Sequence, residues 1–259
     1  MNNVFYIGAT GLNAQQAAVD TTANNIANIN TPAFKRGEVA FSELVSTAPA
    51  SLVRGFAGES RGATTAAGVM AARPSQIFTP GDLRPTGGAL DLAIRGDGFI
   101  ELASDSGQTL LWRGGTLHVG ADGYLAAPNG QHLKAMISVP RDASALTITP
   151  TGQVQALVSS QTDPIDLGEI ELLMPTDTRA LETIGGGVFR TPDDALALSR
   201  ARPGEDSAGL LAQGFSEASN ASLSDELVGL MLYQRAYAAN ARLVQVGDEL
   251  MSIANVLKR

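Results

Sequence analysis

Apolar residues recur at helical spacing near the start of the chain. They repeat every seven residues, and the repeat consists of Phe5, Leu12, Val19 and Ile26. This spacing predicts a helix over residues 3–28 with a wide apolar stripe. Gly8 and Gly11 each weaken such a helix by roughly 1 kcal/mol relative to alanine. The combination favours a helix that becomes ordered only when it packs against a partner.

A second and longer helix is predicted to begin at Ser222 and to reach the last residue, with two apolar stripes. The first stripe contains Leu232, Ala236, Ala239, Leu243, Val246, Leu250, Ile253 and Leu257, and from Leu243 onward it has the 3-4 spacing of a coiled-coil seam. The second stripe contains Leu223, Leu230, Tyr237, Val244 and Met251. Two stripes cover more of the helix than one partner requires. We therefore expect the first helix to pack on this one and other subunits to cover the rest. The alternative is a buried helix of a large domain, but the strand-like region before it offers no other helix.

The region between the helices is predicted to form strands from about residue 76 to residue 215. Leu90, Leu92 and Ile94 alternate, and Asp122-Gly123 and Asn129-Gly130 are typical of hairpin turns. Parallel sheets need intervening helices and none is apparent here, which favours an antiparallel sandwich or barrel-like domain. Residues 46–75 lack periodicity and are interpreted as a long loop or a segment ordered by its neighbours. The predicted fold class is α+β, mainly β, divided into residues 1–45, 46–75, 76–218 and 219–259.

Composition limits the partners of the chain. The net charge of −8 argues against nucleic acid and anionic membranes, and aromatic residues make up only 5%. Cysteine is absent, which excludes disulfides and thiolate metal sites. No basic n-region and no apolar run of about 18 residues is present, so we expect neither a secretory signal nor membrane insertion.

Candidate catalytic and metal-binding residues are few. The two histidines, His118 and His132, do not have the spacing of metal ligands. Gly96-Asp97-Gly98 is not followed by Lys-Ser/Thr and is better interpreted as a hairpin or bulge. Carboxylates such as Asp163 and Glu169 are typical of the solvated face of a strand. We therefore expect no enzymatic activity, no cofactor and no metal.

Four separated motifs resemble the bacterial flagellar rod and hook protein family. The first motif is Ala23-Asn24-Asn25-Ile26-Ala27-Asn28-Ile29-Asn30-Thr31-Pro32-Ala33-Phe34-Lys35, with Ala14-Gln15-Gln16 before it. The second is Leu90-Asp91-Leu92-Ala93-Ile94-Arg95-Gly96-Asp97-Gly98-Phe99, and the third is Gln213-Gly214-Phe215-Ser216-Glu217-Ala218-Ser219-Asn220. The fourth is Gln234-Arg235-Ala236-Tyr237 with Asn240 and Asp248-Glu249-Leu250-Met251. The chain is most similar to the distal rod branch of the family, with the proximal rod branch as the alternative. Ala33 departs from the family pattern, which usually has glycine there.

The resemblance implies a structural subunit that polymerises into a helical homo-oligomer, the rod, which crosses the periplasm and transmits motor torque to the hook. It implies export without a cleaved signal by the flagellar export apparatus, and contacts with other rod proteins, the hook protein and surrounding ring proteins. It also implies that the two terminal helices pair into a coiled-coil inner domain, and that residues 46–75 stiffen the assembly.

The residues expected at subunit interfaces are those of the apolar stripes together with polar residues of the motifs. They are Phe5, Leu12, Val19, Asn24, Asn25, Ile26, Asn28, Phe34, Leu230, Gln234, Arg235, Tyr237, Asn240, Leu243, Val246, Leu250, Ile253 and Leu257. Polar groups on an otherwise apolar helix, such as Gln234 and Asn240, can fix the register between packed helices. A different class, a β-domain carbohydrate-active enzyme or binder with helical oligomerisation arms, remains open from the residues alone.

Overall fold

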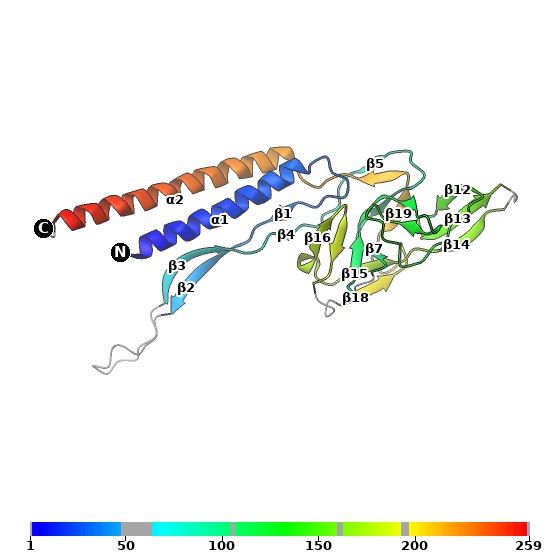
Figure 1. The fold of residues 1–259 in the computed structure, drawn as a ribbon, viewed down its shortest axis with the longest axis horizontal. Helices are drawn as coiled ribbons and strands as arrows, with labels where there is room; N and C mark the ends of the chain where they lie inside the picture. The colour runs from blue at the N-terminus through cyan, green and yellow to red at the C-terminus, as the bar shows by residue number, and fades with distance from the viewer. Residues whose placement is uncertain (1, 48–63, 105–106, 160–162, 193–196, 258–259) are drawn as a thin grey trace, which may run out of the picture. The chain divides into compact units, whose positions relative to one another are not determined.

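The computed structural model describes residues 2–47, 64–104, 107–159, 163–192 and 197–257 (Figure 1). Two long helices occur near the ends of the chain, and the strands lie in the sequence between them. The chain divides into two compact units. We call residues 1–26, 37–75 and 222–259 the helical unit, and residues 27–36 and 76–221 the β unit. The predicted class, α+β and mainly β, is confirmed.

Both helices have nearly the predicted limits. Helix α1 covers Asn2–Ala27 and helix α2 covers Leu223–Leu257. Ser222 precedes α2, and its carbonyl accepts the backbone N–H of Glu226. Neither helix, over the described residues, combines the length and apolar character needed to cross a membrane. Local spacing and capping signals therefore placed these helices correctly.

The helical unit also contains a β-hairpin. Strand β2 (Phe41–Thr47) pairs antiparallel with β3 (Thr64–Ala71). The prediction of a loop for residues 46–75 was therefore wrong for β3, whereas residues 48–63 lie outside the described residues. The strand has no apolar alternation of its own. It pairs with β2, and its Gly68 packs against Thr10 of α1. These contacts agree with the second interpretation of residues 46–75, a segment ordered by its neighbours.

The strands of the β unit are short. Their bounds are β5 (Leu83–Pro85), β6 (Asp91–Arg95), β7 (Phe99–Leu102), β8 (Leu110–Trp112), β9 (Gly114–Thr116), β10 (His118–Val119), β11 (Leu125–Ala126), β12 (Ala143–Ile148), β13 (Gln153–Val158), β14 (Ile165–Glu169), β15 (Leu172–Pro175), β16 (Glu182–Gly185), β17 (Val188–Arg190), β18 (Leu198–Ala201), β19 (Leu210–Gln213) and β20 (Phe215–Glu217). A short 3₁₀ helix, η1, spans Thr178–Ala180. Strands β1 (Gly37–Glu38) and β4 (Ser75–Gln76) form a separate two-stranded sheet.

The largest sheet has the order β16-β17-β8-β7-β15-β18, and the β unit also contains smaller sheets such as β12-β13-β14 and β19-β6-β9. The strand pairs described within the β unit are antiparallel, as predicted. The predicted turns at Asp122-Gly123 and Asn129-Gly130 are confirmed, because Gly123 and Gly130 have φ of 89° and 84°. These positive values are favourable for glycine.

Two apolar clusters form the core of the β unit. The larger one surrounds Trp112, whose side chain is fully buried. In the smaller one, the rings of Phe78, Phe99 and Phe189 meet edge to face at centroid distances of 5.0–5.8 Å. The core of the β unit thus contains Trp112 and a small group of phenylalanines, and aliphatic side chains supply the rest.

Candidate functional site

Helices α1 and α2 run antiparallel and side by side in the helical unit (Figure 1). Small residues line their contact. A Cβ atom on Gly8 would lie 2.6 Å from Val244 Cγ2, and one on Gly11 would lie 2.7 Å from Asn240 Nδ2. Across the seam, Gly247 lies against the ring of Phe5. The glycines that weaken α1 as an isolated helix therefore allow close approach of α2.

Of the two predicted stripes of α2, only part of the second lies at this contact. Val244 faces α1, whereas Leu223, Tyr237 and Met251 of the same stripe are exposed, as are Leu243, Val246 and Leu250 of the first. On α1, the buried positions are the small residues Gly8, Gly11, Ala14 and Ala18, followed by the polar residues Thr22 and Asn25. The predicted seven-residue repeat flanks them and is half-buried: it consists of Phe5, Leu12, Val19 and Ile26.

A polar contact closes the seam at the other end of α1. Asn25 is 2% exposed, and its side-chain amide donates to Glu226 Oε2 at 3.1 Å and to the Gly37 carbonyl at 2.9 Å. Its Oδ1 accepts the backbone N–H of Gly37 at 2.8 Å. The hydrogen-bonding groups of the Asn25 side chain are therefore used inside the helical unit, and a contact of Asn25 with another subunit stays a prediction. Glu226, expected only to complement the helix dipole, is its buried partner.

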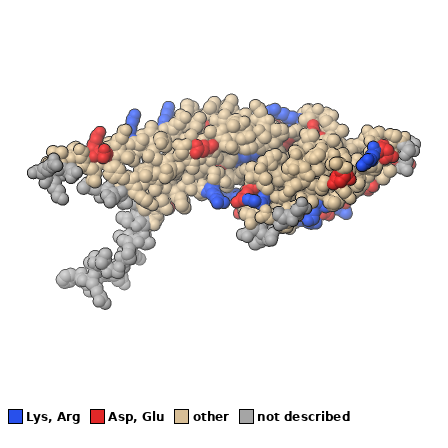
Figure 2. Space-filling view, in the orientation of Figure 1, with Lys and Arg blue, Asp and Glu red and all other residues tan. Residues whose placement is uncertain are grey.

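The first stripe of α2 is an uncovered apolar surface of the helical unit. Leu250 is 58% exposed and Leu257 is 82% exposed. The other exposed large apolar residues of the stripe are Leu232, Leu243, Val246 and Ile253. Figure 2 shows that residues without charge cover most of the helical surface in this view. Monomeric soluble proteins rarely expose continuous apolar surfaces of this kind, which mark interaction sites.

The remaining residues expected at interfaces have mixed positions. Gln234, Arg235 and Tyr237 are exposed on α2, whereas Leu230 and Asn240 are half-buried. Asn24 is exposed at the end of α1. In the β unit, Phe34 and Asn28 are half-buried, and Asn28 Oδ1 accepts the Thr31 hydroxyl at 3.1 Å. Their part in assembly stays a prediction.

The β unit contains a buried ion network that sequence reasoning missed. Lys35 Nζ lies 2.6 Å from Glu217 Oε1, and Arg113 Nε lies 3.0 Å from Glu217 Oε2. All three side chains are at most 3% exposed. The Gly81 N–H also donates to Glu217 Oε1 at 2.8 Å. One carboxylate is thus shared between two cations and a backbone amide.

The other hydrogen bonds of this network connect three of the four sequence motifs. Lys35 Nζ donates to the Thr79 carbonyl at 2.9 Å. The Arg113 guanidinium donates to the carbonyls of Gly96 and Gly98 in the second motif. Lys35 ends the first motif and Glu217 belongs to the third, 182 residues away. Both residues lie in motifs that were identified from the sequence, but only the fold shows that their side chains form an ion pair.

Asn220 and Ala33 complete the docking of residues 27–36 on the rest of the β unit. Asn220 Oδ1 accepts the Arg36 N–H at 2.7 Å, and its amide nitrogen donates to the Ile77 carbonyl at 2.7 Å. The Ala33 N–H donates to the Glu217 carbonyl at 2.8 Å. Ala33 has φ of 56° and is buried. The turn after Pro32 therefore keeps the left-handed backbone that favours glycine, although this chain has alanine there.

Burial lowers the pKa of Lys35 below its ordinary value of 10.5, and this effect exceeds the opposing attraction of Glu217. A lysine with a lower pKa in the folded state releases its proton more readily on folding, so its contribution to stability rises with pH from the folded-state pKa toward 10.5. We expect Lys35→Met to remove this rise, since methionine does not titrate. Denaturant unfolding between about pH 8 and pH 11 would measure it. Lys134→Met, at an exposed lysine, is the control. Parallel stability curves for the parent and Lys35→Met would contradict the expectation.

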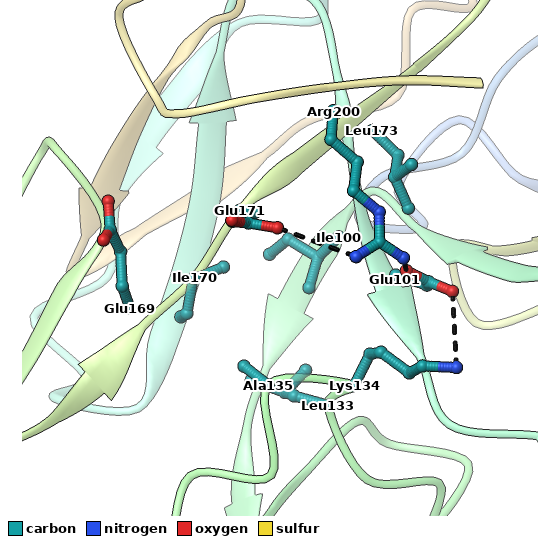
Figure 3. A pocket seen from close by; sticks show the side chains of 10 residues that line it. All are labelled: Ile100, Glu101, Leu133, Lys134, Ala135, Glu169, Ile170, Glu171, Leu173 and Arg200. Carbon is teal, nitrogen blue, oxygen red and sulfur yellow. Dashed lines mark hydrogen bonds and ion pairs between the residues drawn. The ribbon is translucent and has the colours of Figure 1, made fainter.

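A small surface cavity of about 180 Å³ lies beside the largest sheet (Figure 3). Apolar residues such as Ile100 and Leu173 form part of its lining. At its rim, Glu101 pairs with Arg200 at 2.7 Å and with Lys134 at 3.7 Å. Two further carboxylates of the lining also pair with arginines, Glu171 with Arg200 at 3.8 Å and Glu169 with Arg202 at 3.2 Å, so these charged groups are paired with one another.

Candidate metal and catalytic groups were also located. His132 Nε2 lies 3.0 Å from Asp122 Oδ2 beside the predicted turn. Within the described ranges, no cluster of three or more His, Cys, Asp or Glu side chains has the arrangement of a metal site. The candidate sites are therefore the exposed first stripe of α2 and the buried ion network around Glu217.

Three protein-family models match successive parts of the chain. They are described as "Flagella basal body rod protein" over residues 5–35, "Flagellar hook protein FlgE/F/G D1 domain" over residues 93–156 and "Flagellar basal body rod FlgEFG protein C-terminal" over residues 212–257. The first and last matches cover much of α1 and α2, and the middle match covers β7–β13. The matches follow the order of the sequence motifs.

Full-length relatives agree with the family models. A protein of Agrobacterium fabrum named flagellar basal-body rod protein FlgG is 34% identical over 253 residues, covering 96% of this chain and 97% of that protein. FlgG of Caulobacter vibrioides is 31% identical, covering 96% and 97%. FlgF of the same organism is 28% identical, covering 96% and 95%. From these similarities over nearly the whole length, the chain belongs to the flagellar basal-body rod protein family.

Proposed function

We propose that this chain is a structural subunit of the distal rod, which polymerises helically and transmits motor torque to the hook. The observation that carries the proposal is the exposed first stripe of α2 in a chain with rod-protein relatives. Each large aliphatic side chain that becomes buried contributes roughly 1.5–3 kcal/mol. A row of them, repeated in each subunit, supplies a driving force for assembly.

In this proposal, α1 and α2 form a coiled-coil inner domain whose outer stripe packs against copies of the same chain. Their antiparallel contact through small residues and the 3-4 spacing of the exposed stripe support this arrangement. The low charge of the helices also supports it, because neutral surfaces pack together with little repulsion. Residues 46–75 would then stiffen the assembly through the β2–β3 hairpin, on which Phe41, Val45 and Met70 are exposed.

The family also supports the wider setting of this function. We propose that the subunit leaves the cytoplasm through the flagellar export apparatus without a cleaved signal, and assembles in the rod across the periplasm. Its neighbours would be other rod proteins, the hook protein and the surrounding rings. The similarity to FlgG, compared with FlgF of the same organism, favours the distal over the proximal rod. The relatives are named as rod proteins, so a carbohydrate-active domain finds no support in them.

Deletion of residues 253–259 tests this function. The deletion removes Ile253 and Leu257 from the exposed stripe, together contributing roughly 3–6 kcal/mol per subunit when buried. We expect the purified parent to form rods at high concentration in electron micrographs, and the truncated chain to remain monomeric. The β unit should melt as in the parent, because none of the deleted residues belongs to it. Normal rods from the truncated chain would refute a role for this end of α2 in assembly.

A further inference from the structure

We propose that residues 27–36 dock on the rest of the β unit only after the third motif has been synthesised and has packed there. The reason is that Glu217 of this motif supplies the carboxylate that pairs with Lys35 and Arg113. The device lies wholly within the β unit. It goes beyond the assembly function, since it concerns the folding of one subunit and does not require the helical surface.

The first step of the argument is charge. Lys35 and Arg113 are both buried, and among the described residues Glu217 is the carboxylate that pairs with both. Arg113 disfavours the charged form of Lys35, and Asp97 favours it only weakly compared with Glu217. Removing the carboxylate would leave two buried cations without a counter-charge. Breaking a buried ion pair on one side is strongly unfavourable for this reason.

The second step is topology. Residues 27–36 contribute no strand to a sheet of the β unit, and hydrogen bonds join them to two parts of it. One is the segment Ile77–Gly81, through Lys35 and Arg36. The other is the third motif, through Glu217 and Asn220. Lys35 is separated from Glu217 by 182 residues, so this ion pair cannot form until nearly the whole β unit has been made and brought together.

The third step is that the network is separable from the main core. The large apolar cluster around Trp112 contains no residue of 27–36 and none of the third motif. Hydrogen bonds such as Leu125 N–H to the Ile137 carbonyl hold that cluster together independently of the network. We therefore infer that residues 27–36 and the third motif open and close as one local unit, while the sheets stay folded.

Amide hydrogen exchange of the full chain, at a concentration where it is monomeric, tests the inference. The reporters are the N–H groups of Ala33, Arg36 and Gly81, which are bonded to Glu217 or Asn220. The reference N–H groups are those of Leu125 and Leu133. In Glu217→Gln, we expect exchange at the reporters to accelerate at least tenfold, with less than a twofold change at the references.

Two further variants separate charge from shape. Lys35→Met combined with Glu217→Gln should exchange more slowly at Ala33 and Gly81 than Glu217→Gln alone, because one of the unpaired cations is gone. Glu182→Gln, which alters an ion pair to Arg190 nearer the surface, should leave the reporters unchanged. Equal acceleration at reporters and references would overturn the inference, since the network would then be part of the main core. No acceleration in Glu217→Gln, or no rescue by Lys35→Met, would also overturn it.

Discussion

Leu250→Asp should abolish rod formation, whereas Asp248→Ala and Glu249→Ala should leave it close to that of the parent. Leu250 lies in the middle of the exposed stripe of α2, between Val246 and Ile253. A carboxylate at that position would lose its water without gaining a partner when another subunit covers it. That desolvation costs several kcal/mol for each subunit added.

The two neighbouring acidic residues provide matched controls. At about 100° of rotation per residue, Glu249 and Asp248 point away from the stripe by about 100° and 200°. Both are exposed in the subunit. Replacing them should change solvation or surface ion pairs, which are usually worth under about 1 kcal/mol. The three variants therefore change neighbouring residues on one helical turn. Their comparison separates the effect of changing the stripe from the effect of changing any residue of this helix.

Swarming in soft agar by cells that carry only one variant would measure the effect, with export of each subunit checked separately. Electron microscopy of the purified proteins would give the same comparison without the cell. If all three variants form rods and support swarming equally, the exposed stripe is a solvent-facing surface and has no role in assembly.

Gly8→Leu should separate α1 from α2 in the free subunit. Even a Cβ at Gly8 would lie 2.6 Å from Val244 Cγ2, closer than real Cβ contacts occur. Replacing a glycine inside a helix gains up to about 1 kcal/mol in helix propensity. Inserting atoms into a well-packed contact typically costs 1–3 kcal/mol. Because leucine adds three more carbon atoms beyond Cβ, we expect the loss of packing to exceed the gain in propensity.

A second helical glycine tests whether packing is the cause. At Gly229 of α2, a Cβ would meet its nearest atom, on Tyr233, at an ordinary 3.7 Å. Gly229→Ala should therefore stabilise the helical unit by up to about 1 kcal/mol. The measurement is amide exchange in α1 and α2 of the monomeric chain. Val244→Ala should partly rescue Gly8→Leu, because it removes the methyl group that the new Cβ meets. Equal protection in Gly8→Leu and the parent would show that the helices do not depend on this close contact.

Both helices, and the turns at Asp122-Gly123 and Asn129-Gly130, could be predicted from the sequence because their signals are local. A 3.6-residue periodicity and the backbone preferences of glycine act over a few residues, wherever the segment lies in the fold. The same local patterns identified the exposed stripe of α2, and the separated motifs identified the family. They did not show which stripe faces α1.

The tertiary structure decided the features that depend on distant partners. Gly8 and Gly11 look unfavourable in an isolated helix, and only the position of α2 shows that they allow close packing. The bonds of Asn25 to Glu226 and Gly37 likewise depend on the fold. Lys35 and Glu217 are 182 residues apart, and no local pattern pairs a cation with an anion over such a distance. The sequence therefore determined the elements and the kind of protein, while the fold determined which side chains are left to bind other molecules.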